Sequence, residues 1–132
     1  MGGSGQVSAG TGAFTVPVSF PRTAEDAPDT TTPEELFAAS HAVCYGIGLR
    51  SLIARRGGRA RRITVTATVT AEKGARGIRI QSSHLTGVVE TLENLDDAGL
   101  QEVAREVADE CTISIAVRGN VRITHEVSAD RQ

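Results

Sequence analysis

The chain has 132 residues and two cysteines, Cys44 and Cys111, and thiols are among the strongest nucleophiles that side chains offer. Cys44 ends the stretch TTPEELFAASHAVC, in which two glutamates precede an apolar run of small residues. A buried cysteine is most often an inert small hydrophobe, and composition alone favours that reading. The alternative is a reactive thiol, which must be ionised and needs a cation or a helix N-terminus nearby.

Because Cys44 is expected inside a helix, a reactive thiol there would need a cation from elsewhere in the chain. Arg22, in the polar loop that precedes this helix, is the candidate, and Glu34 could orient its guanidinium through a bidentate contact. Cys111 lies near the start of a new helical turn. That position suits a second thiol able to close a disulfide.

Glu34 and Cys44 are ten residues apart on one predicted helix, a rise of about 15 Å. Glu34 therefore cannot contact Cys44 of its own chain. Two such helices crossing antiparallel near the small residues 38–40 would bring the glutamate of one copy close to the cysteine of the other, which suggests a two-fold dimer. The alternative is that Glu34 only stabilises the positive end of the helix dipole.

Alternation of apolar and polar residues predicts the strands that surround this helix. The expected strands cover residues 14–20, 63–70, 77–90 and 121–127. The second and third are joined by the turn KGARG and should form a hairpin. The alternation slips near Ser82–Ser83, which predicts a β-bulge.

Capping residues and periodicity predict the helices. The central helix starts at Thr32, with Glu35 completing a capping box, and runs to about Arg56, where two glycines follow. A second helix opens at Asp96 or Asp97, and TISIAV (112–117) forms a short helix or turn. The order strand, helix, hairpin, helix, strand predicts one α+β domain over residues 1–132, an antiparallel β-sheet packed on a long central helix.

Two stretches carry a family resemblance. TTPEELFAASHAVCYGIGL (31–49) resembles the signature T-N-P-E-E-L-hydrophobic-A-A-x-A-A-C-F of the OsmC/Ohr family of osmotically inducible and organic-hydroperoxide-resistance proteins. ADECTISIAVRGNVRIT (108–124) resembles the family ending C-P-[VI]-S-x-x-L…V-x-I-T. The spacing of the two cysteines is also similar, and the resemblance covers about Gly5 to Val127, closer to the OsmC branch.

The resemblance implies a thiol peroxidase. Cys44 matches the peroxidatic cysteine, whose thiolate attacks the peroxide and becomes a sulfenic acid, and Cys111 matches the resolving cysteine that condenses with it to a disulfide. Glu34 matches the family glutamate, and Arg22 matches the arginine of the OsmC branch. The family reduces organic or fatty-acid hydroperoxides, is often re-reduced by dihydrolipoyl thiols rather than by a bound cofactor, and forms an intertwined homodimer with active sites at the interface.

The chain departs from the family pattern at Thr32, Tyr45 and Thr112, where the family has Asn, Phe and Pro. Tyr45 is expected to make the pocket slightly more polar, and Thr112 to loosen the turn at Cys111. The first strand of the family is expected to be absent or truncated at the N-terminus.

The chain has three histidines, His41, His84 and His125. His41 lies one turn before Cys44, and we expect a packed interface residue, with a general base or metal ligand as the alternative. A zinc site from His41, Cys44 and Cys111 would lack a fourth ligand and the usual ligand spacing, so no metal is expected. His84 and His125 are expected to be structural or surface residues.

The formal charge of −2, the three phenylalanines and one tyrosine, and the absence of tryptophan argue against a nucleic acid or an anionic membrane as partner. The basic run at residues 55–62 is interpreted as a solvated turn. The uncharged stretch 36–49 is too short to span a bilayer, and no secretory signal is recognised, so a cytoplasmic location is expected. The alternatives to a peroxidase are a non-enzymatic redox sensor or a small-molecule binding protein on the same scaffold.

Overall fold

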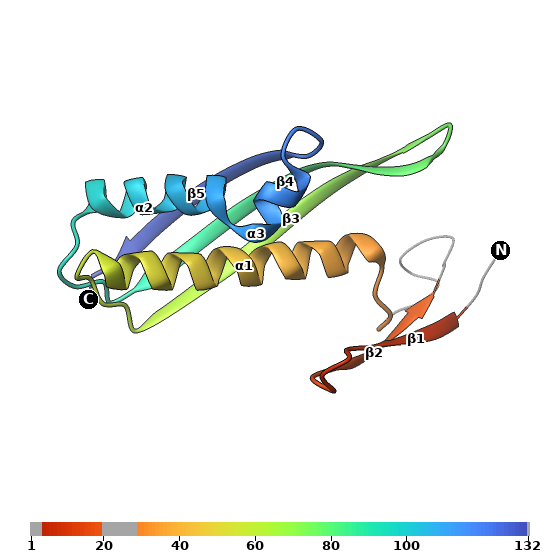
Figure 1. The fold of residues 1–132 in the computed structure, drawn as a ribbon, viewed down its shortest axis with the longest axis horizontal. Helices are drawn as coiled ribbons and strands as arrows, with labels where there is room; N and C mark the ends of the chain where they lie inside the picture. The colour runs from red at the N-terminus through yellow and green to blue at the C-terminus, as the bar shows by residue number, and fades with distance from the viewer. Residues whose placement is uncertain (1–3, 20–28, 132) are drawn as a thin grey trace. The chain divides into compact units, whose positions relative to one another are not determined.

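The apolar stretch after Pro33 forms the long helix α1 (Pro33–Arg55) in a computed structural model that describes residues 4–19 and 29–131 (Figure 1). Thr32 is its N-cap, because the Thr32 hydroxyl accepts a hydrogen bond from the Glu35 N–H at 3.1 Å. The Glu35 carboxylate accepts a hydrogen bond from the Thr31 hydroxyl at 2.6 Å. Gly57, at a φ of 85°, ends the helix. The predicted helix is thus confirmed.

The chain divides into two units, residues 1–37 and 38–132. The first contains an antiparallel hairpin of β1 (Ser4–Ser8) and β2 (Thr15–Ser19). The strand expected over residues 14–20 is confirmed as β2. Strand β1 was not predicted, because SGQVS carries one apolar side chain and no alternation.

The second unit contains a three-stranded sheet of β3 (Arg62–Gly74), β4 (Gly77–Glu90) and β5 (Arg122–Asp130), in the order β3-β4-β5. Strands β3 and β4 form the predicted antiparallel hairpin. Its register shifts between the pairs Thr70–Ser82 and Ala71–Ile80. The predicted bulge therefore falls at residue 81, just before the expected Ser82–Ser83.

Strand β5 corrects one part of the predicted sheet. It pairs with β4 in parallel, whereas an antiparallel sheet was expected throughout. Residues 91–121 carry the chain from the end of β4 back across the sheet through two helices, and a crossover of that kind returns a strand parallel to its neighbour. The α+β class itself is confirmed.

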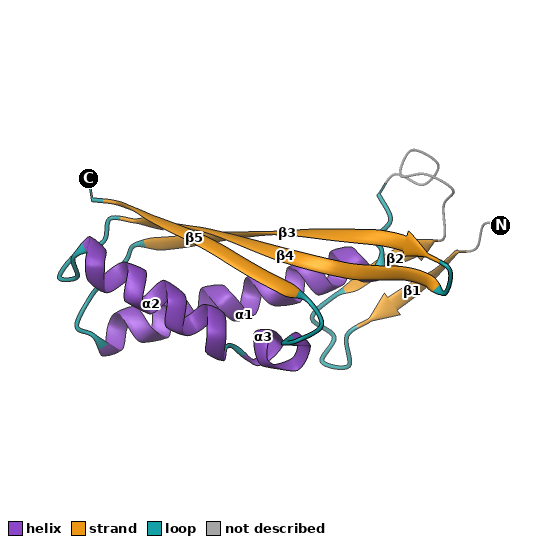
Figure 2. Ribbon diagram, turned by 90° about the horizontal axis from the view of Figure 1, so that it is seen from above, coloured by secondary structure: helices purple, strands orange, loops and turns teal. Residues whose placement is uncertain are grey.

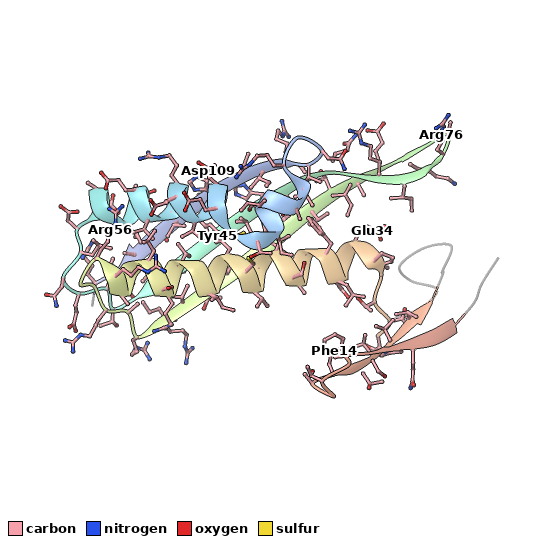
Figure 3. All side chains as sticks on the ribbon, viewed as in Figure 1. Phe14, Glu34, Tyr45, Arg56, Arg76 and Asp109 are labelled. Atoms are coloured by element: carbon pink, nitrogen blue, oxygen red, sulfur yellow. The ribbon has the colours of Figure 1, made fainter. Side chains whose placement is uncertain are left out.

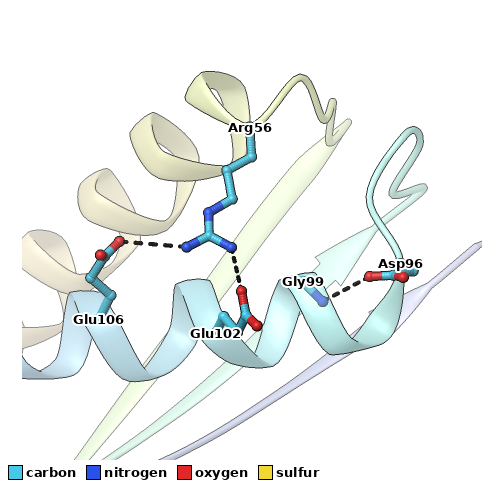
Figure 4. A network of polar contacts seen from close by, with 5 residues as sticks. All are labelled: Arg56, Asp96, Gly99, Glu102 and Glu106. Carbon is cyan, nitrogen blue, oxygen red and sulfur yellow. Dashed lines mark hydrogen bonds and ion pairs between the residues drawn. The ribbon is translucent and has the colours of Figure 1, made fainter.

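Helices α2 (Asp97–Glu110) and α3 (Thr112–Val117) form this crossover. Asp96 caps α2 by accepting a hydrogen bond from the Gly99 N–H at 2.8 Å. Arg56, just after α1, ion-pairs with Glu102 at 2.7 Å and Glu106 at 4.0 Å on α2 (Figure 4). These pairs join the end of α1 to the middle of α2.

Figure 2 shows α1, α2 and α3 on one face of the β3-β4-β5 sheet. The core lies between these helices and the sheet, and its fully buried side chains include Tyr45, Leu49, Leu85, Leu100 and Val103. Exposed threonines of β3 point to the other face of the sheet. They alternate along the strand with half-buried apolar residues that point to the core, as predicted.

By length and composition alone, α1 could cross a membrane, a criterion that core helices of soluble proteins also meet. Four of its residues are buried in this fold: His41, Tyr45, Leu49 and Ile53. They recur every fourth position and form the stripe by which α1 contacts the core.

Candidate active site

The two cysteines are 67 positions apart in sequence (111 − 44) and line the same groove between α1 and α2. Cys44 lies in the middle of α1 and is half-buried. Cys111 is 8% exposed and lies between α2 and α3, as the C-cap of the first and the N-cap of the second. The groove has a volume of about 480 Å³, and both thiols are free.

Packing of α1 against α2 brings the cysteines together. Gly48, one turn after Cys44, faces Val107, one turn before Cys111, and a Cβ on Gly48 would lie 2.5 Å from Val107 Cγ1. Only glycine allows the helices to approach this closely here. The Gly48–Val107 contact therefore sets the spacing of the helices next to the two thiols.

Burial raises the pKa of the Cys111 thiol, because desolvation disfavours the thiolate. Hydrogen bonds from the Ser114 hydroxyl and backbone N–H act in the opposite direction, and the neighbouring Cys44 thiol raises the pKa further. Cys111 is therefore held mainly as a thiol. This suits a residue that reacts second, after its partner has been oxidised.

His41 is linked to Cys111 through Ser114 by a buried chain of hydrogen bonds. Its Nε2 is 2.9 Å from Ser114 Oγ, and its Nδ1 is 2.7 Å from Ser83 Oγ on β4. The Ser114 hydroxyl is in turn 3.1 Å from Cys111 Sγ. Burial lowers the pKa of His41, so the imidazole is neutral near pH 7. It is fully buried within its own chain, so the expectation of an interface residue is corrected.

Tyr45 does not line the groove. Its hydroxyl donates a hydrogen bond of 3.1 Å to the Ala104 carbonyl, and the side chain is fully buried between α1 and α2 (Figure 3). Desolvation raises the pKa of Tyr45, and Cys111 raises it further when its thiol is ionised, so Tyr45 stays protonated. The expected gain in pocket polarity from Tyr45 is therefore wrong, because the hydroxyl bonds to α2 instead.

Charged residues also line the groove. Arg55 comes from α1, and Glu106 and Glu110 come from α2. From the sequence, Arg55 was expected only as part of the basic, solvated run at residues 55–62. Its place in the groove depends on how α2 packs, and no local pattern reports that.

Two predicted site residues, Glu34 and Arg22, come from the part of the sequence before Cys44. Glu34 is half-buried in the first turn of α1. Arg22 lies outside the described residues. Their assignment to the site stays a prediction.

The remaining histidines lie on strands. His84 is partly exposed, with its Nδ1 2.6 Å from Thr124 Oγ1 and its Nε2 3.5 Å from Glu126. His125 stacks at a tilt near Tyr45, with ring centroids 6.5 Å apart. Both have the structural or surface places that were expected. Within residues 4–19 and 29–131, no three or more His, Cys, Asp or Glu side chains are grouped so as to hold a metal ion.

A second feature of α1 is an apolar strip that faces away from the core. Val43 is 60% exposed and Ile47 is 67% exposed, one turn apart. With Gly46, Ile63 and Val65 they line a hollow of about 600 Å³ between α1 and β3. Exposed apolar side chains clustered in this way are typical of an interaction surface.

Comparison with known proteins identifies the family. The model of the OsmC-like protein family matches residues 25–126. No curated protein matches the chain closely enough to be informative.

Several solved structures share the fold. An organic hydroperoxide resistance protein OsmC from Legionella pneumophila aligns with a TM-score of 0.78 at 21% identity, over 97% of this chain and 95% of that one. An organic hydroperoxide resistance protein from Elizabethkingia anophelis aligns with a TM-score of 0.78 at 22% identity, over 98% and 96%. The organic hydroperoxide resistance protein OhrB of Bacillus subtilis aligns with a TM-score of 0.72 at 24% identity, over 97% and 98%.

At these identities the structural likeness establishes the fold. The family model spans more than half of the chain and includes both cysteines, the groove and the Ser83–His41–Ser114 chain. The chain belongs to the OsmC-like protein family.

Proposed function

We propose that the protein is a thiol peroxidase that reduces organic hydroperoxides through Cys44 and Cys111. The observation that carries the proposal is the convergence of the two cysteines of the chain at one solvent-accessible groove. Cysteines that served only as small core hydrophobes would not be expected to line the same solvent-accessible groove. The half-buried thiol of Cys44 can meet a substrate in the groove, and the more buried Cys111 can follow.

In the first step the Cys44 thiolate attacks the outer oxygen of the hydroperoxide. An S–O bond forms, the O–O bond breaks, and the alkoxide leaves as an alcohol after taking up a proton. In the second step Cys111 attacks the sulfenic sulfur; the S–S bond forms and the hydroxyl leaves as water. An external dithiol, of which a dihydrolipoyl group is the expected example, then reduces the disulfide by exchange.

The walls of the groove support an organic substrate rather than hydrogen peroxide. Ile47, Leu52 and Val107 line it beside the cysteines, and their apolar surface gains free energy by covering an alkyl or aryl group. The structurally similar proteins from three bacteria are named for organic hydroperoxide resistance. The preferred hydroperoxide is therefore expected to carry an apolar substituent.

We further propose that the active unit is a homodimer in which Glu34 and Arg22 activate Cys44. Two supports are independent of each other. Val43 and Ile47 expose an apolar strip that a second copy would cover. The helix rise also separates Glu34 from Cys44 of the same chain by about 15 Å. A cytoplasmic location, where thiol reductants are abundant, would suit this chemistry.

The test is consumption of cumene hydroperoxide with a dithiol as reductant, compared with hydrogen peroxide at equal concentration. We expect turnover with the organic substrate in the wild type, none in Cys44→Ser, and slow or reductant-dependent turnover in Cys111→Ser. Arg22→Met should slow the first step, and Ile47→Glu should shift the oligomeric state toward monomer. Equal consumption by wild type and Cys44→Ser would refute the peroxidase.

One alternative is a redox sensor whose disulfide forms but is reduced slowly. The raised pKa of Cys111 favours it, because a thiol of higher pKa is a slower leaving group when a dithiol attacks the disulfide. A sensor would form one disulfide per chain with the hydroperoxide and then stop, even with excess dithiol. Sustained consumption of substrate distinguishes the enzyme from the sensor. A small-molecule binding protein would leave both thiols reduced.

A further inference from the structure

The buried hydrogen bonds that lead from Cys111 to His41 and Ser83 require polar side chains in the core. Packing alone does not explain why the fold pays the free energy of burying them. Ser83, His41 and Ser114 are each 0% exposed, and they place three polar side chains inside the core. Burying polar groups is unfavourable unless each is hydrogen-bonded, and apolar side chains of similar size would avoid the problem. This chain of hydrogen bonds ends at the Cys111 thiol, which the proposed reaction uses. Its position points to a role in that reaction.

Which atom donates in each of these hydrogen bonds follows from the chemistry of the side chains. A neutral imidazole has one N–H donor and one acceptor nitrogen. If the His41 Nδ1–H donates to Ser83, then Nε2 accepts from the Ser114 hydroxyl, and Ser114 Oγ is free to accept from the Cys111 S–H. This arrangement gives one continuous path for a proton from the thiol to the imidazole.

We propose that His41, acting through the Ser114 hydroxyl, is a positioning residue that takes up the Cys111 proton as the Cys44–Cys111 disulfide forms. The inference rests on the proposed function and assigns the base for its second step. Ser114 is the group that contacts the reacting sulfur, and Ser83 holds the imidazole in the tautomer that accepts from Ser114.

The step balances with no further reactant. The Cys111 S–H proton moves to Ser114 Oγ while the Ser114 proton moves to His41 Nε2, and the resulting thiolate attacks the Cys44 sulfenic sulfur. The S–S bond forms, the S–O bond breaks, and hydroxide leaves. The imidazolium returns its proton through the same path, so that the hydroxide departs as water.

The groups around Cys111 are consistent with this direction. Burial keeps the thiol protonated until a base accepts its proton, and the Ser114 hydroxyl and backbone N–H then stabilise the thiolate. Burial also keeps His41 neutral and able to accept. Among the residues that the structure describes, the other titratable or charged groups that face Cys111 or line its groove are Cys44, Tyr45, Arg55, Glu106 and Glu110.

The first test measures Cys111 alone, without any peroxide. In a Cys44→Ser background, the rate of alkylation by iodoacetamide is recorded against pH for the parent and for Ser114→Ala, His41→Gln and Ser83→Ala. Glutamine keeps a polar contact with Ser114 but cannot take up a proton. Ser83→Ala releases the tautomer of the imidazole and is expected to act in part. Tyr45→Phe, added to the series, is the matched control, because it removes an equally buried hydroxyl that bonds to the Ala104 carbonyl, outside the Ser83–His41–Ser114 chain of hydrogen bonds.

We expect Ser114→Ala and His41→Gln to slow alkylation at pH 7 by about tenfold, because each removes support for the thiolate, and to move the pH midpoint upward. Ser83→Ala should slow it in part, Tyr45→Phe should slow it by less than about threefold, and Ser114→Thr, which restores a hydroxyl, should recover the parent rate. Unchanged rates in Ser114→Ala and His41→Gln, or equal slowing in Tyr45→Phe, would overturn the inference. Thermal melts identify any variant that fails to fold.

The second test separates the inference from the proposed function. With Cys44 present, one equivalent of cumene hydroperoxide is added, and hydroperoxide loss and dimedone-trapped sulfenic acid are followed in time. Ser114→Ala should consume hydroperoxide at the wild-type rate but accumulate sulfenic acid. If the wild type consumes no hydroperoxide, the proposed function fails, while the alkylation profiles still decide the role of His41.

Discussion

Gly48→Ala is the substitution that best tests how helix packing positions the thiols. Gly48 lies between Cys44 and the end of α1, and its backbone contacts the Val107 side chain on α2. An added methyl would lie 2.5 Å from Val107 Cγ1 and 3.5 Å from Cγ2. Valine is stiff at χ1 in a helix, so relief requires the helices to move apart.

The expected free energy combines two opposing effects. Replacing glycine by alanine inside a helix is worth about 1 kcal/mol of stability. Forcing an extra methyl into a well-packed core costs about 1–3 kcal/mol. Gly48→Ala should therefore lower the free energy of unfolding by about 0–2 kcal/mol.

Gly46→Ala is the matched control on the same helix. Its new methyl would lie 3.5 Å from Val65 Cγ2, an ordinary contact, so it should raise the free energy of unfolding by about 1 kcal/mol. The two variants should differ by about 1–3 kcal/mol. The double variant Gly48→Ala/Val107→Ala removes the clash and keeps the helix preference for alanine.

Urea unfolding followed by circular dichroism, at one protein concentration for all variants, measures these differences. Disulfide formation with diamide, a non-peroxide oxidant, measures the separation of the thiols, and it should be slower in Gly48→Ala. If Gly48→Ala is as stable as Gly46→Ala and closes its disulfide at the wild-type rate, the contact does not set the spacing of the helices.

The other predictions concern the core and the surface. Tyr45→Phe should lower the free energy of unfolding by about 0.5–1.5 kcal/mol through loss of the hydrogen bond to the Ala104 carbonyl, measured by urea unfolding; an unchanged midpoint would contradict this role. His41 has a pKa lowered by burial, so its contribution to stability is full above its unfolded value of 6.5 and declines as pH falls below it. Melting temperatures from pH 7.5 down to 5 should show this decline in the wild type and less of it in His41→Gln. Arg56→Gln should cost less than about 1 kcal/mol and lose its effect at high salt, because both ion pairs are exposed; a larger, salt-independent loss would show that these pairs fix α2.

Local signals in the sequence were sufficient for most elements. The cap at Thr32, the glycine after Arg56 and the acidic start at Asp96 each act within a few residues, so the helix boundaries could be predicted. The strict alternation in residues 63–70 likewise located β3. The parallel pairing of β5 could not be read in this way, because it depends on the path of residues 91–121 across the sheet.

The candidate site was predictable in part. The cysteines could be paired through the family resemblance, and the structure places them in one groove. The hydrogen bonds from Ser83 through His41 to Ser114 were missed, because the bonded residues are 42 and 73 positions apart and each looks ordinary alone. Tyr45 was misjudged for a related reason: the partner of its hydroxyl lies on α2.

The central claim is that Cys44 is oxidised by a hydroperoxide and resolved by Cys111. Its most direct test is intact mass spectrometry of the reduced protein after one equivalent of cumene hydroperoxide, beside Cys44→Ser and Cys111→Ser. The account predicts loss of two hydrogen atoms in the wild type, gain of one oxygen atom at Cys44 in Cys111→Ser, and no change in Cys44→Ser. Wild-type protein that keeps its reduced mass, while a control thiol peroxidase is oxidised under the same conditions, would contradict it.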